Sequence, residues 1–573
     1  MNRTIVIVLI AAILGPWIGS PALSRSVSGA AARGGAAWGA PVLGRGTAAV
    51  SEDSLRAMVR FLVTNRAADS TRFVLRESSM AVIADSLAAR LGRYTGSSVE
   101  RFSFKIDTVF AAPESIYTAV NIVSRLPGNG SLPGAIFVTA HYDCISTHTP
   151  GWTSRWQTMP SPGADDNATG VAAVMEAARV LRSANLPFAV TFVLFSGEEL
   201  GLRGSAYMVD SLIVNGTFMG ERILGVLNCD MLGYRRADAT VTGCVMSTYD
   251  SGWLSDLIGA ATPDIDPDLA LRIINPAASN SDHGSFWARS IPAVTFIEPL
   301  AESGVIENPH YHSLADTLGV IDFGQTELLT EAVVGFVEKL AKAPAEITMS
   351  TSDLFLVTSY GKITGRRSFL VGDTLRVRAR LRNVGAQNGP RGAAVTLRIS
   401  LQNGRGTQVL YSGSFAAPAA LSASEAEIQL VFTEAFAGEN IVRASIDVSG
   451  MENDPANDSA ELDFRVEGGN PVVLMHAFEP NPITGSFPAA HFCVNLAQAA
   501  ALTIELYNIE GERIATASPA QWGELHAGLN CVPCSQLFPV ESRLASGVYV
   551  YRLISYPPGA PRVATIGRFA VQN

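Results

Sequence analysis

The stretch Phe188-Ala-Val-Thr-Phe-Val-Leu-Phe195-Ser-Gly-Glu198-Glu199-Leu-Gly201 begins with eight residues without a charge. Two adjacent glutamates follow after Ser-Gly. A short apolar run rich in β-branched and aromatic residues is typical of a strand buried on both faces. Similar runs cover residues 135–140, 223–227 and 293–297, and helical patterns such as 170–183 and 324–342 lie between or after them. This alternation predicts an α/β fold with a doubly wound, mostly parallel mixed sheet that is covered by helices on both faces.

Acidic and histidine residues stand just after most of these apolar runs, where the strands are expected to end. In an open α/β sheet, functional groups gather beyond the carboxyl ends of the strands. The candidates that this rule brings together are His141, Asp143, Asp165, Glu198, Glu199, Asp230 and His312. Imidazole nitrogens and carboxylate oxygens are good zinc ligands. The sequence therefore predicts a site for two zinc-like ions, with one spare carboxylate to activate water.

Several assignments of these ligands satisfy the pattern. His141 with either Glu199 or Asp230 can hold one ion, and His312 with the other acid can hold the second. Asp165 is the candidate bridge, because the two oxygens of one carboxylate can each bind an ion at the separation of about 3.5–4 Å that is typical of two-metal sites.

The two remaining acids are expected to support the chemistry. Asp143 stands two residues after His141, so it can hold the other ring nitrogen and fix its tautomer. Adjacent carboxylates do not easily reach one cation together, so one of Glu198 and Glu199 binds and the other accepts a proton from water. Each fragment alone is common in loops, and Asp165-Asp166-Asn167 can simply cap a helix. The joint placement of the set beyond the strands favours the metal site.

Residues 51–345 resemble the secreted co-catalytic dizinc aminopeptidases, the family of the bacterial leucyl aminopeptidases. The matching pieces are His141-Tyr-Asp143, Gly163-Ala-Asp165-Asp-Asn-Ala-Thr-Gly170, Phe195-Ser-Gly-Glu198-Glu199-Leu-Gly-Leu-Arg-Gly204, Asp230-Met-Leu-Gly, Ser281-Asp-His283 and His310-Tyr-His312-Ser-Leu-Ala-Asp-Thr317. The resemblance implies an exopeptidase that acts on free peptide N-termini and holds two co-catalytic Zn²⁺ ions.

The resemblance also implies a role for each site residue. The implied metal ligands are His141, Asp165, Glu199, Asp230 and His312, with Asp165 bridging and a cis peptide at Asp165-Asp166. Glu198 is the implied general base, with Asp143 as its catalytic support. His283 is expected near the site without being a ligand, and the register of Ser313 to Thr317 favours His312 over His310.

The ends of the chain carry other signals. Arg3 followed by the apolar residues 5–14 predicts a signal peptide over residues 1–24, and residues 25–50 form an Ala/Gly-rich flexible leader. No later run reaches the length of a transmembrane helix. The predicted location is therefore secreted, extracellular or at the outer cell surface. A net charge of -10 argues against nucleic acid as a partner.

Beyond residue 345 the long helical patterns give way to alternating strands. Strands are predicted at 374–381, 394–401, 426–432, 440–448, 502–507 and 547–554. Residues 346–467, with Val371-Gly-Asp-Thr-Leu and Arg382-Asn-Val-Gly, resemble an adhesion-type immunoglobulin-like β-sandwich. Residues 468–573 are similar to the C-terminal sorting domain of the type IX secretion route, through Glu479-Pro-Asn-Pro482, Leu506-Tyr-Asn-Ile-Glu-Gly511 and Ala545-Ser-Gly-Val-Tyr-Val-Tyr551. The resemblance implies secretion machinery or the cell surface as a partner, and a plain spacer domain is the alternative.

The cysteines and the rival functions complete the expectations. Cys531 is expected to pair with Cys534 or with Cys493, whereas Cys144, Cys229 and Cys244 are expected to be small buried residues. A carboxypeptidase, a one-metal glutaminyl cyclase on the same fold and a non-catalytic peptide-binding surface protein remain alternatives. The absence of a Gly-x-Ser-x-Gly motif disfavours a serine hydrolase, and the absence of His-Glu-x-x-His disfavours a gluzincin.

Overall fold

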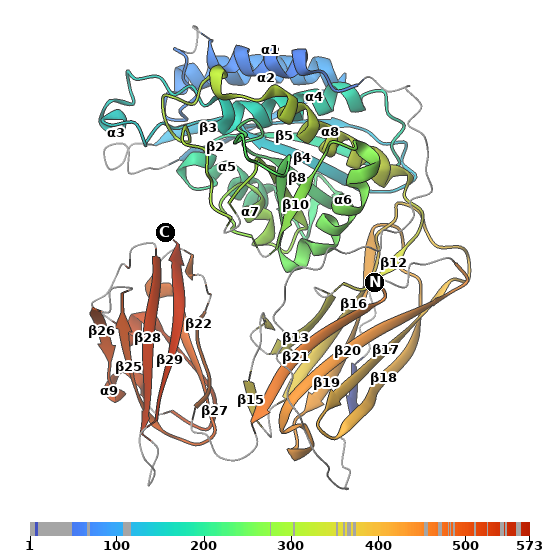
Figure 1. The fold of residues 1–573 in the computed structure, drawn as a ribbon, viewed down its shortest axis with the longest axis vertical. Coiled ribbons are helices and arrows are strands. Elements are labelled where there is room, and N and C mark those ends of the chain that lie inside the picture. Colours follow the sequence, from blue (N-terminus) through green and yellow to red (C-terminus); the bar gives the residue numbers. More distant parts are fainter. Residues whose placement is uncertain are drawn as a thin grey trace.

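The computed structural model describes most of the chain from residue 49 onward (Figure 1). The described residues are 6–9, 49–65, 69–106, 116–275, 277–301, 304–350, 353–358, 361–363, 368–370, 374–451, 457–467, 473–479, 481, 483–484, 487–508, 512–523, 525–538, 544, 547–556 and 563–572. The predicted signal peptide and leader lie outside them, except for residues 49–50 and strand β1 (Val6–Leu9), which pairs in parallel with β19.

A mixed sheet with the strand order β10-β9-β11-β8-β4-β5-β3-β2 forms the centre of the first unit. Its strands are β2 (Val99–Ile106), β3 (Tyr117–Leu126), β4 (Ala135–His141), β5 (Ala189–Phe195), β8 (Glu221–Cys229), β9 (Gly243–Met246), β10 (Leu271–Ile274) and β11 (Ala293–Ile297), with the hairpin of β6 (Ile213–Val214) and β7 (Thr217–Phe218) attached to β8. The central strands β5, β4, β8 and β11 pair in parallel, while β2, β3 and β9 add antiparallel pairings. The α/β class with a mixed sheet is therefore confirmed.

Helices cover both faces of this sheet, as the uncharged central strands require. Helices α1 (Glu52–Val63), α2 (Glu77–Thr95), α4 (Gly170–Leu181), α6 (Gly252–Ile265) and α8 (Phe323–Lys342) contact one another in a single layer. The short helices α5 (Arg203–Tyr207) and α7 (His283–Trp287) contact each other, and α7 also packs on β11.

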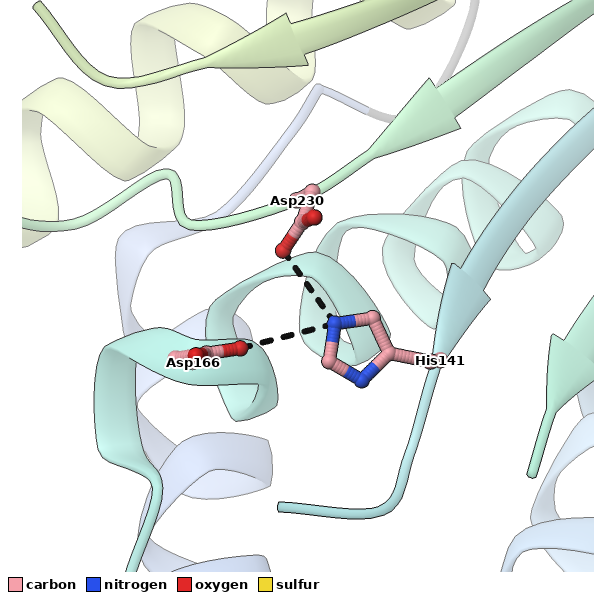
Figure 2. A group of neighbouring side chains, drawn as sticks. All are labelled: His141, Asp166 and Asp230. Atoms are coloured by element: carbon pink, nitrogen blue, oxygen red, sulfur yellow. Dashed lines mark hydrogen bonds and ion pairs between the residues drawn. The ribbon is translucent and has the colours of Figure 1, made fainter. Parts of the chain in front are cut away.

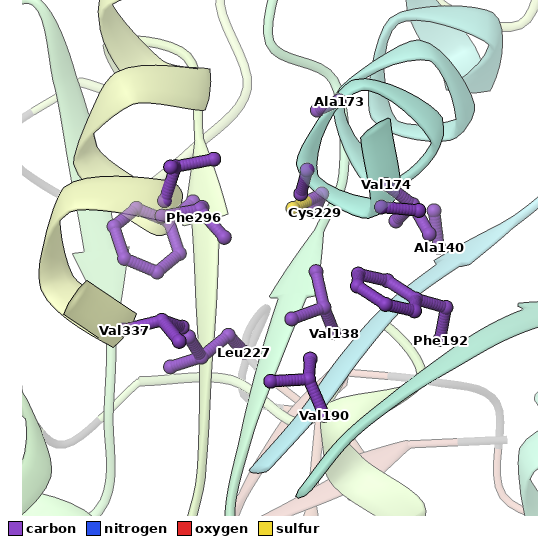
Figure 3. Close-up of a cluster of buried hydrophobic side chains, with 14 of the residues drawn as sticks. Val138, Ala140, Ala173, Val174, Val190, Phe192, Leu227, Cys229, Phe296 and Val337 are labelled. Atoms are coloured by element: carbon purple, nitrogen blue, oxygen red, sulfur yellow. The ribbon is translucent and has the colours of Figure 1, made fainter. Parts of the chain in front are cut away.

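Alternate residues of one strand enter two different cores. In β4, Ile136 and Val138 belong to the large cluster under the helical layer, whereas Ala135 and Phe137 belong to a smaller cluster on the opposite face. Figure 3 shows the larger cluster, in which Val138 and Phe192 lie beneath α4. Fully burying one such side chain stabilises the fold by about 1.5–3 kcal/mol, which explains why the central strands are mostly apolar.

The second unit, which starts near residue 346, is built from two packed sheets. One sheet contains β12 (Ile347–Thr348), β13 (Leu354–Thr358), β14 (Gly361–Ile363), β16 (Thr374–Asn383) and β19 (Ser422–Val431), and the other β15 (Ser368–Leu370), β17 (Ala394–Asn403), β18 (Gly406–Ala416), β20 (Gly438–Ser449) and β21 (Ser459–Glu467). Apolar side chains from both sheets meet in one core, so this unit is a β-sandwich.

The third unit is also all β in its main elements. One sheet contains β22 (Val473–Glu479), β24 (His491–Leu496) and β27 (Gly528–Pro533), and the other β23 (Ile483–Thr484), β25 (Ala501–Tyr507), β26 (Arg513–Ala517), β28 (Gly547–Tyr556) and β29 (Val563–Gln572). The short helices α9 (Pro519–Trp522) and α10 (Cys534–Leu537) join these strands. Cys493 on β24 forms a disulfide with Cys531 on the neighbouring β27, whereas Cys534 is a free, buried thiol.

Two further expectations concern cysteines and membrane helices. Cys144, Cys229 and Cys244 are free and buried, as predicted. Among the described residues, no helix has the length and apolar character needed to cross a bilayer.

Candidate metal centre

Five side chains from five different segments meet at the edge of the sheet where the central strands end. His141 is the last residue of β4, Asp230 follows β8 directly, and Glu199 lies in a short helical turn (Glu198–Leu200) after β5. Asp166 lies in the irregular turn Ala164–Thr169 that leads into α4, and His312 lies in the loop that follows β11. Parallel neighbouring strands bring residues that are far apart in sequence to one edge.

The first group of possible ligands consists of one imidazole and two carboxylates, all buried. The Nε2 atom of His141 lies 3.2 Å from Asp230 Oδ1 and 3.4 Å from Asp166 Oδ1 (Figure 2). The other ring nitrogen, Nδ1, lies 3.2 Å from the main-chain oxygen of Asp143. The ring therefore directs Nε2 to the two acids.

The second group has the same composition. The Nε2 atom of His312 lies 2.8 Å from Glu199 Oε2 and 3.1 Å from Asp166 Oδ2. Asp166 therefore belongs to both groups and presents a different carboxylate oxygen to each histidine. This arrangement matches a carboxylate that bridges two ions.

The structure places Asp166, and not the expected Asp165, in both ligand groups. Asp165 belongs to neither group, and its oxygens are already occupied: Oδ1 accepts a hydrogen bond from the amide of Gly233 at 2.7 Å, and Oδ2 accepts one from Asn308 Nδ2 at 2.8 Å. The cis peptide lies at Asp166-Asn167 instead of Asp165-Asp166. The reason is local: Asp166 has non-helical backbone angles (φ -103°, ψ 93°), so the two consecutive aspartates face different neighbours.

Glu198 lies beside the two groups without joining either. Its Oε2 atom lies 4.0 Å from His141 Nε2, and the side chain lines the pocket over the site. The neighbouring Glu199 keeps one carboxylate oxygen, Oε1, buried without a hydrogen-bond partner. One glutamate is thus among the ligand candidates and the other faces the pocket.

Asp143 supports this glutamate pair through the main chain. Its Oδ1 accepts the amide of Glu198 at 3.2 Å and its Oδ2 accepts the amide of Glu199 at 3.3 Å. Its carboxylate is 3.8 Å from Nδ1 of His141, farther than the main-chain oxygen that meets that atom. The expected carboxylate contact with the ring is therefore a longer ion pair, and the main contact of Asp143 is with the glutamate turn.

The two histidines not expected to be ligands lie apart from both groups. His283 is buried, with Nε2 3.0 Å from the main-chain oxygen of Ala278 and Nδ1 2.5 Å from Thr295 Oγ1. Burial lowers the pKa of His283 to about 4, which keeps its ring neutral. His310 packs its ring against Tyr234.

A pocket opens directly onto the site. Its wall combines the acids Asp166, Glu198 and Asp230 with a group of apolar side chains. The apolar members are Met231, Met246, Ile297 and Ile306. A ligand in this pocket therefore meets both acidic and apolar side chains.

The site contains more buried acid than buried base. Asp143, Asp165, Asp282, Glu298 and Asp316 are all buried close to the ligand candidates, and burial raises the pKa of each. Among the described residues, Arg72 is the one buried arginine or lysine, and it donates to the main-chain oxygens of Tyr142, Pro162 and Gly163. Buried charges of one sign are costly unless cations pair with them.

The residues present fit two cations of the zinc type. Each group offers one imidazole nitrogen and two carboxylates within 4.8 Å of one another, the donor types that zinc prefers. Glu199 Oε1, which lacks a hydrogen-bond partner in the described structure, could coordinate such an ion. Sequence reasoning missed Asp166 because two adjacent aspartates carry the same signal, and it missed Asp316 and Arg72 because their role lies in main-chain contacts.

Part of this chain is similar to known proteins. Residues 121–337 match the sequence model of the family described as Peptidase family M28. A probable leucine aminopeptidase 1 of Trichophyton verrucosum is 30% identical over 243 residues, which cover 39% of this chain and 58% of that protein. Aminopeptidase YwaD of Bacillus subtilis is 29% identical over 248 residues, which cover 42% of this chain and 50% of that protein. This chain thus spans little more than half the length of these two relatives.

Among solved structures, the LapA aminopeptidase of Legionella pneumophila is 21% identical with a TM-score of 0.40, over 51% of this chain and 72% of that chain. The matched span 121–337 contains all five residues of the two candidate ligand groups. The part of the chain that forms the site is therefore the part that matches Peptidase family M28.

Proposed function

We propose that this protein is a zinc-dependent aminopeptidase, a hydrolase that removes the N-terminal residue of peptides. The observation that carries the proposal is Asp166, whose two oxygens face two separate groups that each contain a histidine and a second carboxylate. In this proposal one Zn²⁺ is held by His141, Asp230 and Asp166, and the other by His312, Glu199 and Asp166. The similarity of residues 121–337 to Peptidase family M28 supports the same reading.

The side chains around the site divide the remaining tasks. When bound, a pair of zinc ions would polarise the scissile carbonyl and lower the pKa of a water molecule at the site. Glu198 faces the pocket, so its carboxylate is placed to accept the proton of that water and to deliver it to the nitrogen of the leaving amine. Asp143 holds the main chain of both glutamates, which fixes the base beside the ligand.

The lining of the pocket favours an aminopeptidase over a carboxypeptidase. Among the described residues that line it, none is an arginine or lysine that could pair with a substrate carboxylate. The presence of two complete ligand groups favours two ions over the single ion of a glutaminyl cyclase.

The rest of the chain supports an exported enzyme. We assign residues 1–24 to a signal peptide, 25–50 to a leader, 51–345 to the peptidase domain, 346–467 to an immunoglobulin-like domain and 468–573 to a C-terminal sorting or anchoring domain. The two-sheet core of residues 347–466 and the separate core of residues 478–571 support two β modules after the peptidase. A secreted or outer-surface location follows, with the last module contacting secretion machinery or the cell surface.

A panel of short substrates tests the proposal. The purified chain is incubated with zinc and with aminoacyl nitroanilides, free peptides and the same peptides carrying an N-acetyl group, and the products are identified by mass spectrometry. Release of single residues from free N-termini alone is the expected result. Release of C-terminal residues from acetylated peptides would replace the aminopeptidase proposal with a carboxypeptidase.

A further inference from the structure

Two buried aspartates, Asp143 and Asp316, each accept hydrogen bonds from two consecutive main-chain amides in this site. Asp143 does so for Glu198 and Glu199, as described above. Asp316 does the same for the other acidic pair: its Oδ1 accepts the amide of Asp165 at 2.8 Å and its Oδ2 accepts the amide of Asp166 at 3.0 Å. Each ligand-bearing pair of acids is therefore held from behind by one carboxylate.

Asp316 also joins two of the ligand-bearing segments. It follows His312 by four residues, and its main-chain oxygen accepts the amide of Ala164 at 3.2 Å. Its own amide donates to the main-chain oxygen of Ser313 at 3.1 Å. The loop that carries His312 is thus attached to the turn that carries Asp166 by three hydrogen bonds, all of them made by one residue.

The loop around His312 needs such an attachment. His312 has a φ of 53°, in the left-handed region that residues other than glycine rarely adopt, so the surrounding contacts must hold it there. The main-chain oxygen of His312 accepts the amide of His148 at 2.8 Å from one side. Asp316 holds the same loop from the other side, against the turn of Asp166.

We propose that Asp316 is a positioning residue that sets the Asp166 carboxylate between the two ion sites and fixes its spacing to His312. This inference rests on the proposed function, because it assigns Asp316 to the same two-ion site. Asp316 belongs to neither ligand group, and both of its oxygens are engaged by amides. A carboxylate that receives two amide donors fixes the plane of the peptide units it holds. Because Asp166 is shared, a displacement of its main chain affects both ions.

The test compares Asp316→Asn with wild type and two reference variants. Asparagine keeps one acceptor oxygen and places an NH₂ group opposite the second amide, so one of the two contacts is lost. Asp143→Asn makes the equivalent change at the glutamate turn. Asp322→Ala removes the side chain that caps α8, six residues away, and lies outside the site.

Titration of the metal-free proteins with Zn²⁺ and with Co²⁺ gives the main readout. Asp316→Asn is expected to lower the affinity for both ions by about 10- to 100-fold and to change the visible absorption of bound Co²⁺. Its kcat is expected to fall while its KM changes little, and Asp316→Glu is expected to recover less than wild-type affinity because its carboxylate lies one methylene farther out. Asp143→Asn is expected to weaken mainly the ion at Glu199, and Asp322→Ala to bind both ions like wild type with a lower melting temperature.

The inference is overturned if Asp316→Asn binds both ions with wild-type affinity and an unchanged Co²⁺ spectrum. It is also overturned if Asp316→Asn and Asp316→Glu both fail to fold, because the residue is then structural, or if they lose only thermal stability as Asp322→Ala does. Failure of the proposed function is a different result: wild type itself then binds fewer than two ions or does not hydrolyse free N-termini.

Discussion

Glu198 is placed to move a proton without being needed to hold an ion. It lies outside both ligand groups and lines the pocket, whereas its neighbour Glu199 contacts His312. We therefore expect Glu198→Gln to bind two zinc ions while its kcat falls by roughly 10²- to 10⁴-fold, since glutamine has no basic oxygen. Metal analysis and steady-state kinetics on the same preparation check this, with Glu331→Gln on α8 as the control. Wild-type turnover by Glu198→Gln would remove the residue from this role.

The histidine ligands predict how zinc loading depends on pH. Burial alone lowers the pKa of His312, but the carboxylates of Glu199 and Asp166 outweigh it and raise that pKa to about 11 in the metal-free protein. The pKa of His141 is also raised, because Glu198 and Asp230 outweigh its burial. The ring of His312 is therefore protonated at neutral pH without metal, and zinc binds the neutral form.

Zinc binding at pH 7 is thus expected to release protons, and the apparent affinity is expected to fall as the pH is lowered. The folding stability of the metal-free protein depends on pH in the opposite direction, because protonated His312 favours the folded state. The contribution of His312 is fully present below its unfolded pKa of about 6.5 and is lost as the pH rises through about 11. Calorimetric titration in two buffers with different heats of ionisation measures the proton release. Identical heats in both buffers would show that no proton is released.

The choice between Asp165 and Asp166 could not be predicted from the sequence. The sequence correctly predicts that His141, Glu199, Asp230 and His312 lie together beyond the strands, because strand ends bring such residues to one edge. It cannot separate two adjacent aspartates, because the choice depends on the backbone angles of one turn. Those angles are set by tertiary contacts, such as the amides that Asp316 accepts.

Gly170, the first residue of α4, packs closely against the main chain at the end of β8. A Cβ at this position would lie 2.3 Å from Asn167 Oδ1 and 2.3 Å from the main-chain oxygen of Cys229, the residue before Asp230. Gly170→Ala is therefore expected to lower the free energy of unfolding by more than about 1 kcal/mol, within the range of overpacking effects. It is also expected to weaken zinc binding, because Asp166 and Asp230 lie on the two displaced segments.

Gly259 in α6 is the matched control for this change. A Cβ there would meet only Ile273, at 3.9 Å, and alanine favours the helix interior. Gly259→Ala is expected to raise the free energy of unfolding by about 0.5–1 kcal/mol. Urea titrations of both variants measure the difference. Equal effects of the two substitutions would contradict the contact at Gly170.

The strands and helices themselves were largely predictable. The uncharged runs at 135–140 and 293–297 form β4 and β11 almost residue for residue, because strands buried on both faces need continuous apolar sequence. Strands β2 (Val99–Ile106), β3, β9 and β10 of the same sheet were not predicted. Strand β2 lies at the edge of the sheet, where the exposed Arg101 and Lys105 interrupt its apolar pattern.

The first unit and the last module have separate hydrophobic cores. We therefore expect metal chelation and disulfide reduction to destabilise different parts of the chain. The core of the first unit also contains Val384 and Leu421 from the first β module, so these two units share packing. The buried core of the last module consists of residues between 478 and 571, and the same module contains the disulfide between Cys493 and Cys531. The order and class of the units were predictable from the sequence, whereas this shared packing was not, because it involves single loop residues.

Reduction of the disulfide is expected to destabilise only the last module. A cross-link between residues 38 apart in sequence contributes about 2–4 kcal/mol. Scanning calorimetry with a reductant should shift the transition of the last module downward, and a chelator should shift the transition of the first unit instead. A single transition that moves with both treatments would show that the units unfold together.

The central claim is that the two oxygens of Asp166 lie between two zinc ions. Anomalous diffraction above and below the zinc absorption edge, on crystals of the zinc-loaded protein, tests it most directly. The account predicts two anomalous peaks about 3.5–4 Å apart, one beside His141 and Asp230 and the other beside Glu199 and His312, with Asp166 between them. A single peak, or a pair of peaks bridged by Asp165, would contradict it.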